Sequence, residues 1–177
     1  MNRKLNNKSQ LYSQIFIYIL AILLTSFILI FGYNAVKDFQ ARTEQVACLK
    51  FQNDLKSAVN IISSDYGSVE RKDLQLCSGY KGVCFVDYEI NEENKNNLQF
   101  LYVNYAAEPS IDDPIIKDSI LSDAKKDVFF VDKIAKESFY VGKISIDGDV
   151  LCIKAVGNKI SLKLEGKGDY TLLSEWT

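Results

Sequence analysis

The chain has 177 residues, a formal net charge of −2 and no histidine. This length accommodates one membrane anchor and one modest domain. The near-neutral charge gives no basic field for nucleic acid, and the sequence has no zinc-finger, helix-turn-helix or RNA-binding spacing. Histidine is the commonest general base and metal ligand, so its absence argues against most enzymatic and metal chemistry. We therefore expect no enzyme and no cofactor.

The first predicted element is an apolar helix near the N-terminus. Residues 15–31 read IFIYILAILLTSFILIF, of which thirteen are Ile, Leu or Phe. Together these side chains favour membrane insertion by about 4 to 8 kcal/mol. The uncharged stretch 9–36 is long enough, as a helix, to cross a bilayer and its headgroups. We predict a transmembrane segment over about residues 11–33.

Charge predicts the orientation of this segment. Arg3, Lys4 and Lys8 precede it, and the first acidic residue is Asp38. The positive-inside bias places the N-terminus in the cytoplasm and residues from about 37 outside the cell membrane. A cleaved secretory signal is the alternative, but its apolar region is normally only about 7 to 15 residues long. The exit sequence, FGYNA at 31–35, also has no small-x-small cleavage site.

The helical pattern continues beyond the apolar segment. Residues 36–66 have no proline and no glycine, and Gly67 is a plausible C-terminal stop. Apolar residues recur at steps of three and four, which is typical of an amphipathic helix. We predict one helix over about 11–64, the alternative being two helices with a bend near Gly32 and Asn34. Its apolar stripe contains Cys48, Phe51, Leu55, Ala58, Val59 and Ile62.

The sequence Lys8-Ser9-Gln10-Leu11, placed before the apolar run, resembles the junction of a class III signal peptide in archaeal type IV pilin-like proteins. In that family a membrane-bound prepilin-type peptidase cuts after a small residue preceded by a charged one. The resemblance implies a cut between Ser9 and Gln10. Ser9 stands where Gly or Ala is usual, and Gln14 stands where many bacterial pilins carry Glu. An uncleaved single-pass anchor is the alternative.

The resemblance also implies a fold and partners. Pilin-like proteins have a long N-terminal helix, half in the membrane or filament core and half packed on a β-rich head. The implied domains are a basic cytoplasmic leader at 1–9, the long helix at 10–66 and an extracytoplasmic head at 67–177. The implied partners are membrane lipid, the peptidase, and copies of this chain or other pilin-like subunits.

In the first part of the head, residues 83–90 and 98–105 are rich in Val, Phe, Ile and Tyr and predict two strands. The polar segment 91–97 joins them. Residues 111–126 predict a short helix, with Asp113 as the N-cap and Pro114 in the first turn. Its predicted inner face contains Ile115, Ile116, Ile120 and Ala124.

The C-terminal part predicts an antiparallel meander. Asp147-Gly148 and Gly157-Asn158 are two-residue hairpin signals, and a last strand covers 170–174. The turns set Ile144 opposite Leu151, and Leu151 opposite Leu164. We therefore predict an α+β fold with one antiparallel sheet packed on the amphipathic helix half. The shared apolar face contains Ile144, Leu151, Ile153, Ala155, Ile160, Leu162 and Leu164.

The chain has four cysteines that can form disulfides in an outward-facing domain, with three connectivities possible if all of them pair: Cys48, Cys77, Cys84 and Cys152. Cys77 and Cys84 flank the turn-like stretch SGYKGV, which favours a disulfide between them. Cys48 and Cys152 would then pair by elimination. However, Cys152 alternates away from Leu151, so these two are free buried thiols unless the helix covers that other sheet face. No C-x-x-C pair favours zinc, and no histidine could activate a cysteine nucleophile.

The carboxylates form no specific constellation. Asp112-Asp113 is best explained as a helix cap, Asp147 with Asp149 as turn chemistry, and Glu92-Glu93 as a solvated loop. The function that we predict is a membrane-anchored, pilin-like subunit, structural or minor, of a type IV pilus-like surface filament. The alternative is a non-assembling anchored ectodomain that binds a partner or ligand.

Overall fold

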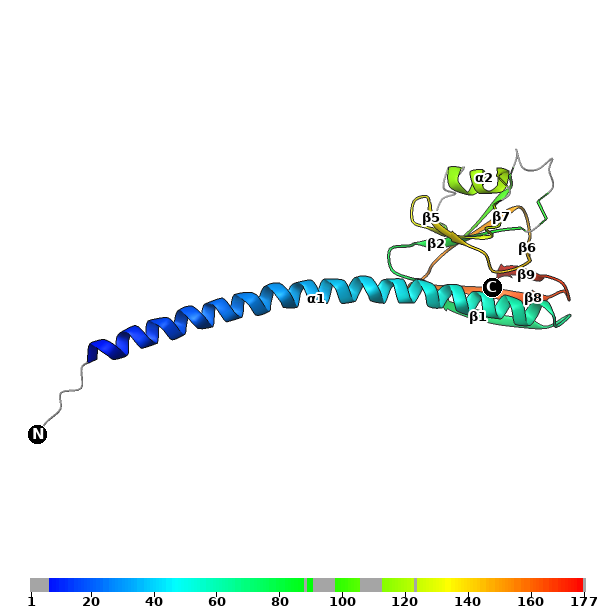
Figure 1. The fold of residues 1–177 in the computed structure, drawn as a ribbon. Helices are drawn as coiled ribbons and strands as arrows, with labels where there is room; N and C mark the ends of the chain where they lie inside the picture. The colour runs from blue at the N-terminus through cyan, green and yellow to red at the C-terminus, as the bar shows by residue number, and fades with distance from the viewer. Residues whose placement is uncertain (1–6, 88, 91–97, 106–112, 123, 177) are drawn as a thin grey trace, which may run out of the picture. The chain divides into compact units, whose positions relative to one another are not determined.

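The computed structural model describes residues 7–87, 89–90, 98–105, 113–122 and 124–176 (Figure 1). The chain forms two compact units, Met1–Thr43 and Glu44–Thr177. Helix α1 (Asn7–Ser63) contributes its first part to the first unit and its last part to the second. The second unit is called the head below.

In the first unit, α1 is uncharged and mostly apolar over residues 15–36, and its described side chains are all exposed. The helix is uninterrupted at Gly32 and Asn34, so the prediction of a single helix is confirmed over the apolar segment. The hydroxyl of Thr25 donates to the carbonyl of Ala21 at 3.0 Å, and that of Ser26 donates to Ile22 at 2.8 Å. These bonds satisfy two polar groups within the helix, which is what a lipid-facing helix requires.

The head contains two β-sheets. In the four-stranded sheet the order is β1-β8-β9-β6, and in the five-stranded sheet it is β3-β7-β2-β4-β5. Two pairs, β6 with β9 and β3 with β7, are parallel, and the others are antiparallel. The strands are β1 (Val69–Gln75), β2 (Gly82–Val86), β3 (Phe100–Val103), β4 (Val128–Val131), β5 (Ala135–Phe139), β6 (Ile144–Ile146), β7 (Val150–Lys154), β8 (Lys159–Gly166) and β9 (Thr171–Glu175).

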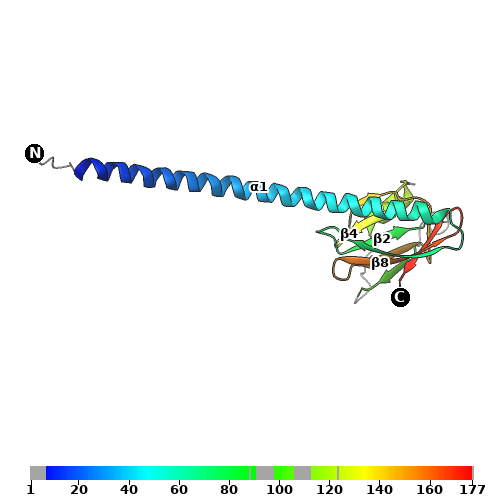
Figure 2. The same ribbon diagram turned by 90° about the horizontal axis from the view of Figure 1, so that it is seen from below.

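The last part of α1 runs beside the strands of the head (Figure 2), and one hydrophobic core joins it to both sheets. The predicted stripe is confirmed, because it is buried from Phe51 to Ile62 and Cys48 packs at its edge. A buried hydrogen bond, 3.1 Å from the hydroxyl of Thr171 to the carbonyl of Val59, ties β9 to the helix. The buried helix residues are Phe51, Leu55, Ala58, Val59 and Ile62.

A second, smaller cluster lies on the other face of the five-stranded sheet, where helix α2 (Pro114–Leu121) packs. The predicted cap is confirmed, because Asp113 precedes the helix and Pro114 occupies its first turn. The predicted inner face is only half right. Ile116 and Ile120 are buried, whereas Ile115 and Ala124 are exposed. The helix ends at Leu121, before its pattern could bring Ala124 inward.

The predicted meander is wrong in its pairing. Strand β6 pairs with β9 and strand β7 pairs with β2 and β3, so Ile144 does not lie opposite Leu151. At Gly157-Asn158 only the bridge between Val156 and Lys159 forms, after which β8 joins the other sheet. Both turns therefore connect strands of different sheets. The residues of the predicted apolar face still lie in one core, because the two sheets face each other across it.

Candidate functional site

The apolar part of α1 is the most extended exposed hydrophobic surface in the described part of the chain. From Ile15 to Phe31 its large side chains are about half to three-quarters exposed. Among the described residues it belongs to the one helix that is long and apolar enough to cross a membrane. This single N-terminal helix is compatible with a membrane anchor, and a signal sequence or the core helix of a soluble protein also meets this criterion of length and composition.

The predicted processing junction lies at the start of this helix. Lys8, Ser9 and Gln10 fall within the first turn of α1. Their side chains, and residues 1–6, lie outside the part of the chain that the structure describes. The processing prediction therefore stays a prediction.

The predicted disulfide between Cys77 and Cys84 is wrong. The structure pairs Cys48 with Cys77 and Cys84 with Cys152, and none of the four cysteines is free. The reason is the strand order. Because β2 lies beside β7, Cys84 is directly opposite Cys152, with their Cα atoms 4.0 Å apart. Cys77 instead follows β1 and lies against the helix, where the Cα of Cys48 is 4.9 Å away.

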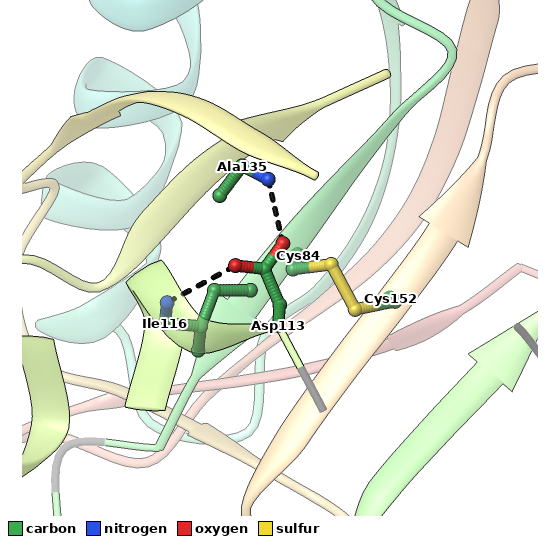
Figure 3. Close-up of a disulfide and its surroundings, with 5 residues drawn as sticks. All are labelled: Cys84, Asp113, Ile116, Ala135 and Cys152. Atoms are coloured by element: carbon green, nitrogen blue, oxygen red, sulfur yellow. Dashed lines mark hydrogen bonds between the residues drawn. A yellow bond between two sulfur atoms is a disulfide. The ribbon is translucent and has the colours of Figure 1, made fainter. Parts of the chain in front are cut away.

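Asp113 lies beside the Cys84–Cys152 disulfide (Figure 3). One carboxylate oxygen accepts from the backbone N–H groups of Ile115 at 3.0 Å and Ile116 at 3.3 Å. The other accepts from the N–H of Ala135 at 2.6 Å. These three donors compensate the burial of the carboxylate, which is only 4 % exposed. Asp113 thus fixes the start of α2 to the start of β5.

The same disulfide borders a cavity of about 310 Å³ on the α2 side of the five-stranded sheet. Its aromatic wall comes from β3 and the residues that follow it. The rings of Phe100 and Tyr102 are nearly parallel with centroids 6.1 Å apart, and Tyr105 meets Tyr102 edge-on at 5.6 Å. Burial raises the pKa of the Tyr105 hydroxyl. An apolar cavity with a few polar groups is the usual form of a small-molecule site.

The edge of this cavity is charged. Asp132 and Lys133 lie on it, at the end of β4. Asp132 binds Lys81 at 2.8 Å and Lys136 at 3.3 Å, and hydrogen bonds from these two lysines hold its pKa below the usual range. The carboxylates of Asp113 and Asp132 are therefore both engaged by neighbouring groups.

Asp127 is a buried carboxylate that the sequence reasoning did not single out. It precedes β4 and accepts from the backbone N–H groups of Val141 at 3.0 Å and Gly142 at 3.2 Å. Burial raises the pKa of Asp127 to about 6, and these hydrogen bonds oppose the rise. The side chain anchors the segment in which the chain leaves β5 for β6. No sequence signal distinguishes it from other acidic residues that precede apolar runs.

The remaining candidates have structural roles or lie outside the described residues. Asp149 accepts from the N–H of Gln99 at 2.8 Å, beside the turn that contains Asp147. Asp112, Glu92 and Glu93 fall in segments that the structure does not describe. Within the described segments no three His, Cys, Asp or Glu side chains gather as a metal site.

Comparisons of the chain with models of protein families, with curated proteins and with solved structures give no match.

Proposed function

We propose that the chain is a single-pass membrane protein of the pilin-like class, a structural or minor subunit of a type IV pilus-like surface filament. The observation that carries the proposal is the composition of α1. The same helix provides an exposed apolar segment at its start and the buried stripe of the head at its end. In the proposed orientation the N-terminus is cytoplasmic and the disulfide-bonded head is outside.

The exposed segment needs an apolar environment. Fully burying one Leu, Ile or Phe side chain contributes about 1.5 to 3 kcal/mol, and this segment exposes more than ten of them. Soluble monomers rarely expose contiguous apolar surface on this scale. Lipid and the apolar segments of other subunits both satisfy the requirement. A subunit that passes from the membrane into a filament would use each in turn.

Processing at Ser9 tests the pilin-like part of this proposal. The chain is co-expressed with a prepilin-type peptidase and followed by gel shift, with Ser9→Leu as the test variant and Ser13→Leu as the matched control. A small residue before the cut is required, so we expect a shift in the wild type and in Ser13→Leu, and no shift in Ser9→Leu. An unshifted wild type would contradict class III processing.

Assembly is tested in the same strains. Surface material is sheared from the cells, examined by electron microscopy and probed for the head. We expect filaments that contain the chain from wild-type and Ser13→Leu cells, and none from Ser9→Leu cells. Processed chain without filaments would favour the non-assembling ectodomain.

The cavity beside the Cys84–Cys152 disulfide favours this second candidate, an anchored ectodomain that binds a small ligand. Fluorinated aromatic fragments and ¹⁹F NMR of the full chain in lipid nanodiscs would test it. Val131→Phe places a larger side chain in the wall of the cavity, and Val156→Phe adds the same side chain at an exposed site. Fragment binding that only Val131→Phe removes would support a ligand site. Equal binding to empty nanodiscs would count against it.

A further inference from the structure

The two disulfides follow one another along the chain without nesting or crossing. The first joins Cys48 to Cys77 across a separation of 29 residues, and the second joins Cys84 to Cys152 across 68. A covalent route from α1 to the C-terminus therefore runs through Cys48, Cys77, Cys84 and Cys152. It bypasses most of the head, because the residues between each pair lie in closed loops.

We propose that this arrangement is a tension-bearing device, which carries force from the N-terminal helix past the hydrophobic core. The source of the force rests on the proposed function, since an anchored or assembled α1 is where a pull on the head would be resisted. The device itself depends only on which cysteines are joined and on what the closed loops contain.

The first disulfide stands at the entrance of the helix into the head. The head begins at Glu44, and Cys48 comes one turn later. The buried stripe begins at Phe51, inside the closed loop. Without the bridge, a pull through α1 would act first on Phe51 and then on Leu55, removing the helix from the core one turn at a time. With the bridge, the pull passes from Cys48 to Cys77, which is buried just after β1.

The second disulfide lies in the middle of the five-stranded sheet. Strands β2 and β7 are neighbours in the order β3-β7-β2-β4-β5, and Cys84 faces Cys152 across them. The closed loop contains β3, α2, β4, β5 and β6. Force that arrives through Cys77 passes along the chain to Cys84 in β2. From Cys84 it crosses the disulfide to Cys152 and continues along the chain toward β8. The enclosed elements, including the Asp113 cap and the Asp127 anchor, are outside this route.

The closed loops also limit how far the head can be extended. At about 3.4 Å per extended residue, the first disulfide withholds about 100 Å of chain and the second about 230 Å. These two lengths differ enough to identify each bridge from the extension released when it is absent.

Force spectroscopy on the detergent-solubilised full chain tests the proposal. Peptide-tag handles are attached at the N-terminus and the C-terminus of the wild type, of the pair Cys48→Ser/Cys77→Ser and of the pair Cys84→Ser/Cys152→Ser. We expect the unfolding extension to grow by about 100 Å in the first variant and by about 230 Å in the second. If the Cys48 pair alone fails to fold, wild type reduced after folding provides the measurement, with both increments expected together.

A second pulling geometry separates force transmission from ordinary stabilisation. One handle is moved to Ser57, an exposed position of α1 inside the first closed loop, so that force reaches the core helix directly. Loss of the Cys48–Cys77 bridge should shorten the lifetime under constant force at least about tenfold in the N-terminal geometry and less than about twofold in the Ser57 geometry. Equal shortening in both geometries, or extensions unchanged by the Cys→Ser pairs, would overturn the proposal.

The outcome is independent of the proposed function. Processing and filament assembly are measured in cells, whereas these lifetimes are measured on single purified chains. A chain that forms no filaments can still show the geometry-dependent lifetime, and a filament subunit can fail to show it.

Discussion

The first and last parts of α1 belong to the same helix, but their surroundings are opposite. Around Leu23 every side chain is apolar or nearly so, and all described side chains are exposed. Around Leu55 apolar side chains recur at steps of three and four, and those on the stripe are buried. The difference shows how pattern and burial correspond, because the last part has apolar residues on one helical face and buries that face, whereas the first part is apolar all round and buries none of its described side chains.

The largest expected effect comes from the buried half. Phe51 is 1 % exposed and packs edge-on against the ring of Phe130, with centroids 5.2 Å apart. Phe51→Ala should lower the free energy of unfolding of the head by about 3 to 5 kcal/mol, through lost contacts and a cavity. Phe39→Ala is the matched control, because Phe39 is 71 % exposed and its loss should cost no more than about 0.5 kcal/mol. Urea titrations followed by the fluorescence of Trp176, the only tryptophan, measure both.

In the exposed half, we expect a large effect from introducing a charge and not from removing side-chain volume. Leu23→Lys should cost about 3 kcal/mol of membrane insertion, because a lysine at the centre of a span is poorly solvated. Its readout is the fraction of chain that stays in the membrane pellet after carbonate extraction. Leu121→Lys, which places the same charge on an exposed residue of α2, should leave that fraction unchanged. Unaltered membrane retention of Leu23→Lys would contradict the anchor.

The pH dependence of the free energy of unfolding tests the buried region separately, because the titrating group lies in the head and not in the exposed part of α1. The pKa of Asp127 rises from the ordinary 3.8 to about 6 in the folded state, so between these values the folded state binds more protons than the unfolded state. The contribution is fully present below pH 3.8 and is lost as the pH rises through about 6. Asp127→Asn should remove a fall of about 2 to 3 kcal/mol across this range.

The difference between the wild-type and Asp127→Asn stability curves isolates this carboxyl. Exposed Asp73 and half-buried Asp132 and Glu165 have lowered pKa values and contribute slopes of the opposite sign, but they are common to both chains. A difference curve that is flat between pH 4 and pH 6 would contradict the assignment.

The smallest expected effect is at the start of α2. Asp113→Ala removes the N-cap and leaves the buried N–H of Ala135 without its acceptor, so it should cost about 1 to 2 kcal/mol. Asp118→Ala, at an exposed position of the same helix, should stay within about 0.5 kcal/mol of wild type. The two variants are compared by thermal unfolding of the full chain. Equal melting temperatures would show that the carboxylate of Asp113 does not stabilise the head.

The sequence predicted the elements whose pattern is local. The stripe from Phe51 to Ile62 and the cap at Asp113 depend on spacings of a few residues, and both are confirmed. Strand β1 was not predicted, because in VERKDLQ only Leu74 is buried and no alternation is visible.

Strand pairing could not be predicted in the same way. Alternation indicated that Leu151 and Leu162 face the core, and they do, but it contains no information on which sheet each strand joins. The disulfides share this limit. Cys84 meets Cys152 only because β2 and β7 are neighbours, and a short spacing wrongly favoured Cys77. The cavity beside Tyr102 depends on the same pairing, since residues of four strands, β2, β3, β4 and β7, and of α2 form its wall.

The mass and N-terminal sequence of the protein extracted from native membranes test the central claim most directly. We predict a mature chain that begins at Gln10, retains the apolar part of α1 and needs detergent to leave the membrane. A chain that begins beyond Val36, or that is soluble and monomeric without detergent, would contradict the account.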